Sequence, residues 1–457
     1  MYQKLSFEVE YLTEQHLTGF ESYKVSFPAG WTKYFIDLYF QYSSVDTNPL
    51  SVYVMHPFWN KVVQYCPKWV APNVLTFFGF LFTVFNFTLF AFYDYYLYAS
   101  SDDKPQYPPI PRWVFALGVF NVFMAYTLDG IDGKQARRTQ TSGPLGELFD
   151  HGLDSWTTML ISVCMFSVFG RTDHSVSPLR MYFILWNVFI SFYLTHWEKY
   201  NTGVLFLPWG YDLSMVGTIV VFIISSIGGH KAWKFVFPGG IPVGVIFEIL
   251  LYVTAIVSSL PVVLWNIYKS YRDKTGKMRT FLDAIRPLLP LAVLFAISTI
   301  WVVHSPSNII EKDPRIVFLA IGTIFSNICC RLIVSQMSNT RCELLPWILL
   351  PVAVIAIFSF ILPSVDLIFT YILAIVALLA HIHYGTCVVR FILIFFKYVK
   401  CVVIFVFTRS VSKIVQTDYL PTIHVKNEEI RTNSREELRT SENRSDRQTV
   451  KKFQDHH

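Results

Sequence analysis

Long apolar segments dominate this chain and set the strongest limit on its fold. Ten of them approach or exceed the length of about 20 residues that a helix needs to cross a bilayer. They cover 72–93, 112–128, 155–170, 179–196, 213–229, 241–267, 286–304, 315–336, 344–362 and 365–386. Charged residues make up only 15% of the chain, against about 25% in an average soluble protein. The runs also lack the strict alternation of barrel strands. The sequence therefore predicts an all-α polytopic membrane protein with about ten transmembrane helices.

The charges of the connecting loops predict which side of the membrane they face, because Lys and Arg concentrate in cytosolic loops. The loop 268–280 carries five basic residues against Asp273 alone: Lys269, Arg272, Lys274, Lys277 and Arg279. Counting spans from this loop places both chain termini and the segment 129–154 on the cytosolic side. The basic residues of the loop 129–143 agree with that orientation.

The N-terminal part of the chain is expected to precede and enter the membrane domain. Residues 1–48 are predicted to be a cytosolic segment, and residues 49–387 the membrane domain. Within that domain, 49–64 has apolar residues at helical spacing but is too short to span. We therefore expect an N-terminal interfacial amphipathic helix that leads into the first span.

The C-terminal part is expected to leave the membrane. Residues 388–407 are strongly apolar, but Arg390, Lys397 and Lys400 fall on one helical face. This pattern favours a second interfacial helix over an eleventh span. Residues 408–457 contain many charged and few apolar residues, which predicts a disordered cytosolic tail.

Net charge and cysteine content exclude several classes of protein. The net charge of +6 is modest and fits loops that face a negatively charged membrane surface better than a nucleic-acid partner. The seven cysteines form no CxxC pair and no Cys/His metal spacing. Neither a disulfide scaffold nor a zinc site is expected.

Four aspartates are grouped between the second and third apolar segments. Asp129 and Asp132 are three residues apart, so they share one face at the end of the second span. Gly143-Pro144 breaks the chain, and the proline is suited to the first position of a new helix. On that helix Asp150 and Asp154 are four residues apart and again share a face. The spacing predicts that two antiparallel helices bring four carboxylates together at the membrane boundary.

Such a cluster needs compensation for its charge. Hard divalent cations with oxygen ligands supply it, and two metal ions can clamp a diphosphate. Gly130 and Gly133 remove side chains beside the aspartates, which lets a bulky anion approach the backbone. Helix caps or solvated loop charges would explain one aspartate pair but not four. A divalent-cation transporter is the alternative from a different class, although the nearby Gly, Lys and Arg favour an anionic phosphate.

These residues match a known signature, Asp-x-x-Asp-Gly-x-x-Ala-Arg-x8-Gly-x3-Asp-x3-Asp. Its fixed positions are met by Asp129, Asp132, Gly133, Ala136, Arg137, Gly146, Asp150 and Asp154. The chain therefore resembles the CDP-alcohol phosphotransferase (class-I phosphatidyltransferase) family. Over 45–387, segments such as Ala71-Pro-Asn-Val-Leu-Thr76 look like the eukaryotic choline/ethanolamine phosphotransferases. His196-Trp-Glu-Lys-Tyr-Asn-Thr-Gly203 and Leu207-Pro-Trp-Gly-Tyr-Asp212 look most like their ethanolamine branch. The stretch 27–44 is interpreted as an insertion.

The resemblance implies an activity and a set of ligands. Members of the family transfer a phospho-alcohol from a CDP-alcohol to a lipid hydroxyl and release CMP. The implied substrates are CDP-ethanolamine and 1,2-diacylglycerol, and the implied product is phosphatidylethanolamine. A choline or dual-specificity enzyme stays open, because sequence physics does not separate the two head groups. The resemblance also implies two Mg²⁺ or Mn²⁺ ions held by Asp129, Asp132, Asp150 and Asp154. The residues implied to line the CDP-alcohol pocket are Asn73, Gly133, Arg137, Glu147 and Gly152.

His151 is the residue favoured as the base that takes the proton from the diacylglycerol hydroxyl. It lies between Asp150 and Gly152, and the resemblance assigns the proton acceptor to this position. An imidazole suits the task. Asp154 is the competing candidate, and His151 could instead only orient an aspartate. His196 and Glu198 end a span on the same side, where a head-group contact and a membrane-interface anchor are both open.

The expected surroundings follow from the resemblance and the span count. We expect the active site to face the cytosol from an endoplasmic reticulum or Golgi membrane. Membrane lipids are the expected partners and nucleic acid is not. A homodimer is expected from the family, although no segment of the sequence locates an interface.

Overall fold

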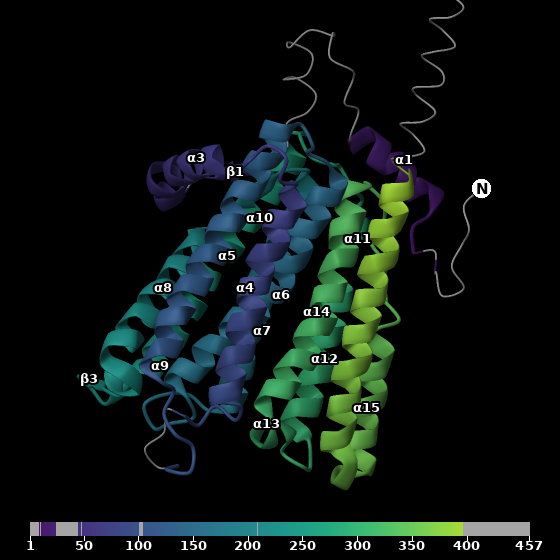
Figure 1. Cartoon of the computed structure of the whole chain (residues 1–457). Helices are drawn as coiled ribbons and strands as arrows, with labels where there is room; N and C mark the ends of the chain where they lie inside the picture. Colours follow the sequence, from purple (N-terminus) through teal and green to yellow (C-terminus); the bar gives the residue numbers. More distant parts are fainter. Residues whose placement is uncertain are drawn as a thin grey trace, which may run out of the picture. The chain divides into compact units, whose positions relative to one another are not determined.

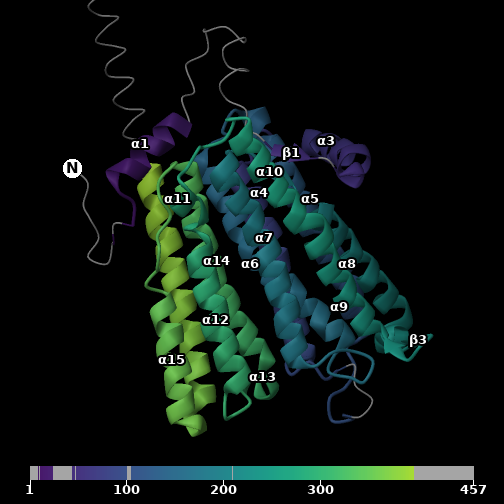
Figure 2. The same cartoon turned by 180° about the vertical axis from the view of Figure 1, so that it is seen from behind.

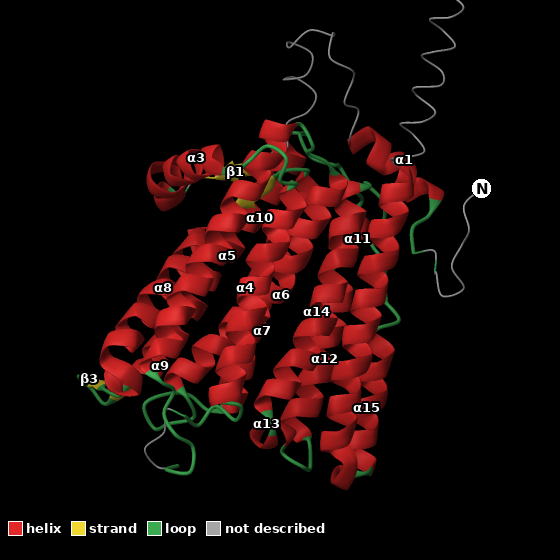
Figure 3. Ribbon diagram, in the orientation of Figure 1, coloured by secondary structure: helices red, strands yellow, loops and turns green. Residues whose placement is uncertain are grey.

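The computed structural model describes residues 9, 11–23, 44–46, 48–99, 104–207 and 209–395. The predicted stretch 27–44, apart from Ser44, and the predicted tail 408–457 lie outside these residues. Contacts divide the chain into two units, Met1–Arg390 and Phe391–His457, and the helical bundle lies within the first. Among the described residues helix prevails throughout (Figure 3), as the sequence predicts. Two small sheets complete the secondary structure: β1 (Ser44–Asp46) runs parallel to β2 (Leu205–Leu207), and β3 (Val236–Phe237) antiparallel to β4 (Ile241–Pro242).

Helices that run along the length of the bundle form most of the fold (Figure 1). They are α4 (Pro72–Tyr93), α5 (Arg112–Thr139), α6 (Pro144–Phe169), α7 (Pro178–Thr202), α8 (Trp209–Gly228), α9 (Val243–Val253), α10 (Leu260–Arg272), α12 (Leu288–His304), α14 (Pro314–Met337) and α15 (Leu349–Ile361). The π-helix η3 (Thr254–Ser259) joins α9 to α10 without a break. The last described helix follows η4 (Pro363–Val365) and continues to Phe395.

Shorter helices lie at the two ends of the bundle. At the end drawn uppermost in Figure 1 are α1 (Glu14–Tyr23), η1 (Ser51–Met55), α3 (His56–Tyr65) and α11 (Phe281–Ile285). At the opposite end are η2 (Gly229–Trp233) and α13 (Ile309–Lys312). The view from behind shows the same grouping (Figure 2). The segment predicted to be an interfacial helix is helical, since η1 and α3 cover Ser51–Tyr65; its place at the membrane interface stays a prediction.

Within the described part of the chain, seven helical stretches are long and apolar enough to cross a membrane. They are Pro72–Tyr93, Arg112–Thr139, Pro144–Phe169, Gly210–Trp233, Val243–Arg272, Pro314–Met337 and Pro363–Phe395. The two shorter apolar helices α12 and α15, together with α7 of 25 residues, account for the other predicted segments. The prediction of an all-α polytopic membrane protein is confirmed.

Helices α5 and α6 extend beyond the apolar segments that were predicted as spans. These segments end at 128 and begin again at 155. Helix α5 continues to Thr139, and α6 begins at Pro144, where Gly143-Pro144 predicts a new helix. Hydropathy falls where polar residues begin, whereas a helix ends only where its backbone hydrogen bonds end. The last helix runs unbroken to Phe395. Residues 396–407 lie outside the described residues, and the interfacial helix over 388–407 stays a prediction.

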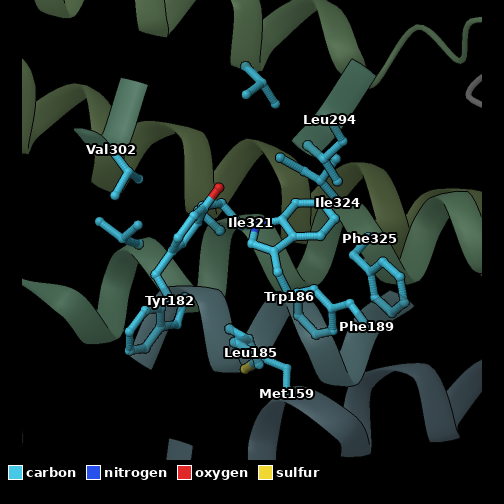
Figure 4. Close-up of a cluster of buried hydrophobic side chains, with 14 of the residues drawn as sticks. Met159, Tyr182, Leu185, Trp186, Phe189, Leu294, Val302, Ile321, Ile324 and Phe325 are labelled. Atoms are coloured by element: carbon cyan, nitrogen blue, oxygen red, sulfur yellow. The ribbon is translucent and has the colours of Figure 1, made fainter. Parts of the chain in front are cut away.

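Helix α14 forms the centre of the larger hydrophobic core. It is almost wholly buried, as expected of a helix that is apolar all round. Figure 4 shows side chains of α6, α7 and α12 packed around it, with Phe189 stacked on Phe325 at 4.1 Å between ring centroids. A second cluster joins α3, α4, α5 and α8 through residues such as Trp59 and Tyr126. Helix α6 contributes side chains of its second half to both clusters, so this half is packed on two sides.

Candidate active site at the junction of α5 and α6

A tight reversal of the chain brings the end of α5 beside the start of α6. Gln140 ends α5 in the left-handed conformation, with φ of 57°, and its N–H bonds back to the carbonyls of Ala136 and Arg137. Pro144 then occupies the first turn of α6, where the missing N–H costs no hydrogen bond. The two helices are therefore antiparallel here, and their facing sides carry the aspartates.

The four aspartates come together as predicted from their spacing. Asp129, Asp132 and Asp150 offer oxygen atoms that all lie within 4.8 Å of one another. Asp150, His151 and Asp154 offer a second group of ligand atoms within the same distance. Asp150 belongs to both groups, so the two are adjacent. Carboxylate oxygens at this separation repel one another unless a cation lies among them, and an all-oxygen donor set is what Mg²⁺ and Mn²⁺ prefer. The residues present therefore fit a divalent-metal centre.

Two hydroxyl groups from other helices hold these carboxylates. Thr76 of α4 donates through Oγ1 to Asp132 Oδ2 at 2.5 Å. Tyr211 of α8 donates through its hydroxyl to Asp129 Oδ2 at 2.6 Å. The sequence analysis did not identify either residue as part of the site. Each is far from the aspartates along the chain, so spacing carries no signal that they meet.

A cavity of about 310 Å³, counted with the open space at its mouth, adjoins the aspartates. It is lined from α4, α5, α6 and α8, and its wall is polar near Asp129, Asp154 and Tyr211. Away from them the lining becomes apolar, with Phe80, Leu153 and Met215 among its members. The cavity thus has a charged end and an apolar end. Such a cavity suits a substrate that has a charged part and an apolar part.

His151 lies beside the aspartates on α6, and its ring also meets α7. Its Nδ1 is 3.8 Å from Asp154 Oδ2 and 4.0 Å from Asp150 Oδ2, distances longer than a hydrogen bond. Its ring meets that of His196 on α7 edge to face, with 5.1 Å between centroids. His196 is only 2% exposed, and Glu198 accepts a hydrogen bond from Asn266 at 2.7 Å. Burial of both residues within the protein argues against the expected alternative of a membrane-interface anchor.

Glu147 lies one turn before His151 and is buried in an ion pair. Lys199 of α7 pairs with its carboxylate, and Gln336 of α14 donates to Glu147 Oε1 at 3.1 Å. The sequence analysis did not identify either partner as part of the site. Glu147, implied to line the CDP-alcohol pocket, thus also ties α6 to α7 and α14.

The other implied pocket residues occupy different surroundings. Asn73 lies at the start of α4, with Oδ1 3.6 Å from the point where a Cβ on Gly146 would be. A Cβ on Gly133 would lie 3.6 Å from Arg137 Nη1, and the Arg137 side chain is exposed at the end of α5. Gly152 instead packs against Cys330 of α14, whose Sγ would lie 3.3 Å from a Cβ. The small size of Gly152 therefore permits a close helix contact.

The amphipathic helix α3 is fastened beside the same junction. Arg138 donates to the carbonyl oxygen atoms of Val63 at 2.8 Å and Cys66 at 2.5 Å. Trp59 packs over Gly130, where a Cβ would approach within 2.1 Å of the indole ring. Gly130, which was expected to admit an anion, therefore makes room for α3.

Comparison with known proteins agrees with this geometry. The family model for CDP-alcohol phosphatidyltransferase matches residues 69–258, which include all four aspartates. The chain is 46% identical over 384 residues to human ethanolaminephosphotransferase 1, covering 83% of this chain and 91% of the relative. It is 34% identical over 318 residues to choline/ethanolaminephosphotransferase 1 of Arabidopsis thaliana, covering 66% and 76%. Rat cholinephosphotransferase 1 is 27% identical over 292 residues, covering 62% and 69%. The protein therefore belongs to the CDP-alcohol phosphatidyltransferase family.

Proposed function

We propose that this protein transfers phosphoethanolamine from CDP-ethanolamine to the hydroxyl of 1,2-diacylglycerol, giving phosphatidylethanolamine and CMP. The observation that carries the proposal is the 46% identity to human ethanolaminephosphotransferase 1 over 91% of that relative. The family match supports the transferase over the alternative of a divalent-cation transporter. The acidic cluster at the polar end of a cavity with an apolar wall supports the same reaction.

The four aspartates are proposed to hold two Mg²⁺ or Mn²⁺ ions. When bound, these ions would neutralise the diphosphate of the donor and the charge that develops on the departing CMP. Asn73, Gly133, Arg137, Glu147 and Gly152 are proposed to form the CDP-alcohol pocket. Arg137 is suited to an anion because its guanidinium is exposed at the end of α5. Glu147 and Gly152 would act chiefly by fixing α6 against α7 and α14.

His151 is proposed as the proton acceptor. It would take the proton of the diacylglycerol hydroxyl, whose oxygen forms the new bond to the phosphorus that bears ethanolamine. The bond between that phosphorus and the bridging oxygen then breaks, and CMP leaves with the electron pair. A position next to the acidic cluster, with the ring also meeting His196, would let the imidazole reach the hydroxyl of an acceptor lipid bound beside the aspartates.

The finer setting of the reaction is also proposed. The aspartates and the basic loop 268–280 lie at one end of the bundle, since Lys277 N–H bonds to the carbonyl of Asn201 at 2.9 Å and Lys199 pairs with Glu147. The concentration of basic residues there supports a cytosolic site in the endoplasmic reticulum or Golgi membrane. A homodimer stays a prediction.

The test is to incubate the purified protein with diacylglycerol, Mg²⁺ or Mn²⁺, and either CDP-ethanolamine or CDP-choline, and to follow CMP release. We expect CMP from CDP-ethanolamine, with the lipid product identified by mass spectrometry. Absence of CMP with either donor would contradict the enzyme reaction. Preference for CDP-choline would support the same class of reaction with choline in place of ethanolamine. A choline or dual-specificity enzyme is the second candidate because of the similarity to the Arabidopsis choline/ethanolaminephosphotransferase.

A further inference from the structure

The first turn of α8 directs two adjacent side chains into the region of the acidic cluster. Tyr211 reaches Asp129, and Asp212 reaches Tyr126 on the same helix α5. Neither residue belongs to the signature that carries the aspartates. Helix α8 begins 65 residues after the start of α6, yet Tyr211 in its first turn contacts a candidate metal ligand directly.

Tyr211 contacts the cluster through one atom. Its hydroxyl donates to Asp129 Oδ2 at 2.6 Å, and the residue borders the cavity together with Asp129 and Asp154. Its ring packs edge to face against Tyr126, with 6.0 Å between centroids. A hydroxyl bound to one carboxylate oxygen restricts rotation of the Asp129 side chain. The other carboxylate oxygen of Asp129 is then held toward the neighbouring aspartates. Without the hydrogen bond, rotation of the side chain would move this oxygen away.

Asp212 explains why Tyr211 holds this position. Its side chain is 4% exposed and accepts hydrogen bonds from three groups. The donors are Tyr126 of α5, Ser51 of η1 and, at 3.2 Å, Asn48. Charge-assisted hydrogen bonds of this kind are strong, and a buried carboxylate that lost them would be costly. The start of α8 is therefore fixed to α5 and to the helix that leads into α3.

We propose that Tyr211 is a positioning residue for Asp129, and that Asp212 anchors it to α5. The inference rests on the proposed role of Asp129 as a metal ligand. Groups that orient metal ligands through hydrogen bonds contribute to affinity although they do not touch the ion. Tyr211 thus makes α8 a contributor to metal binding, beyond the two helices that carry the signature.

The test measures binding of Mn²⁺ alone to the full-length protein in detergent, by electron paramagnetic resonance of the free ion. Tyr211→Phe keeps the ring against Tyr126 and removes only the hydroxyl. We expect its Kd for Mn²⁺ to rise about ten- to hundred-fold, while its melting temperature stays close to that of the unsubstituted protein. In turnover assays the Mn²⁺ concentration for half-maximal rate should rise more than the KM for CDP-ethanolamine.

Tyr182→Phe is the matched control. Tyr182 is also a buried tyrosine whose hydroxyl is within 2.9 Å of Ser298 and Thr299, far from the aspartates in the core of Figure 4. Its loss should leave the Kd for Mn²⁺ unchanged. A Kd for Tyr211→Phe within two-fold of the unsubstituted value, or an equal rise in both variants, would overturn the positioning role. Absence of Mn²⁺ binding by the unsubstituted protein would overturn the metal site of the proposed function as well.

Discussion

At the scale of the single residue, His151 and Asp154 compete for the role of base, and their surroundings differ. Asp154 and His151 both offer atoms to one group of potential metal ligands, but the signature of four aspartates implies that Asp154 holds the metal, and Asp154 also lines the cavity. His151 is buried toward α7 and meets His196. A ligand that holds a cation is a poor proton acceptor, because the cation stabilises its charged form. This contrast favours His151 as the base.

His151→Ala should abolish turnover while CDP-ethanolamine still binds. Loss of a general base typically reduces the rate by about 10²- to 10⁴-fold, and the residue is not among the proposed donor-pocket groups. CMP release measures the rate, and isothermal titration with CDP-ethanolamine measures binding. His304→Ala, an exposed histidine at the far end of α12, is the control. Turnover by His151→Ala near that of the control would reject the role as base.

Lys199 tests the buried ion pair beside the base. Lys199→Met removes the cation that pairs with Glu147 and leaves a buried carboxylate that only partly keeps its hydrogen bonds. Breaking such a pair costs about 3–5 kcal/mol, so we expect a clear fall in melting temperature, read by tryptophan fluorescence. Adding Glu147→Gln should restore much of the loss. If the double variant melts no higher than Lys199→Met, the ion pair is not the source of the effect.

Chelation tests the acidic cluster as a whole. Removing divalent ions with EDTA should stop CMP release, because four carboxylates without cations repel both one another and the donor diphosphate. Adding Mg²⁺ or Mn²⁺ should restore the rate, and Ca²⁺ serves as a control because it prefers more ligands at longer distances. Full activity in EDTA would contradict the metal centre.

At the scale of the helix, the seating of α3 on α5 depends on Gly130. A Cβ at that position would lie 2.1 Å from the Trp59 ring, so Gly130→Ala must displace α3. Overpacking of this kind costs about 1–3 kcal/mol, and displacement beside Asp129 should also lower CMP release. Gly217→Ala on α8 is the control, since nothing lies within 4 Å of its added Cβ. Equal melting temperatures for the two variants would show that α3 adjusts without cost.

The same helices show what the sequence predicts and what it does not. The convergence of the aspartates follows from helical periodicity, and the start of α6 from Pro144, since both depend on neighbours within a few residues. The apolar segments 112–128 and 155–170 are shorter than α5 and α6, because polar residues end a hydropathy run without ending a helix. Thr76, Tyr211, Lys199 and Gln336 meet the site through packing of separate helices. No local spacing encodes such contacts, so only the structure identifies these residues.

At the scale of the whole molecule, the charged end and the opposite end of the bundle should face different sides of the membrane. Lys274 lies in the basic loop after α10, and Lys104 precedes α5 at the other end; both are exposed. In a background without other cysteines, Lys274→Cys and Lys104→Cys place one thiol at each end. In sealed vesicles with the cytosolic face outward, a membrane-impermeant maleimide should label Lys274→Cys at once and Lys104→Cys only after detergent is added. The soluble donor CDP-ethanolamine reaches only the cytosolic face without a transporter. Labelling of Lys104→Cys at once and of Lys274→Cys only after detergent would therefore contradict the proposed orientation. It would also contradict access of the donor to Asp129 and its neighbours. Equal labelling of both thiols before detergent would mean that the vesicles are open, which a trapped soluble dye checks in the same sample.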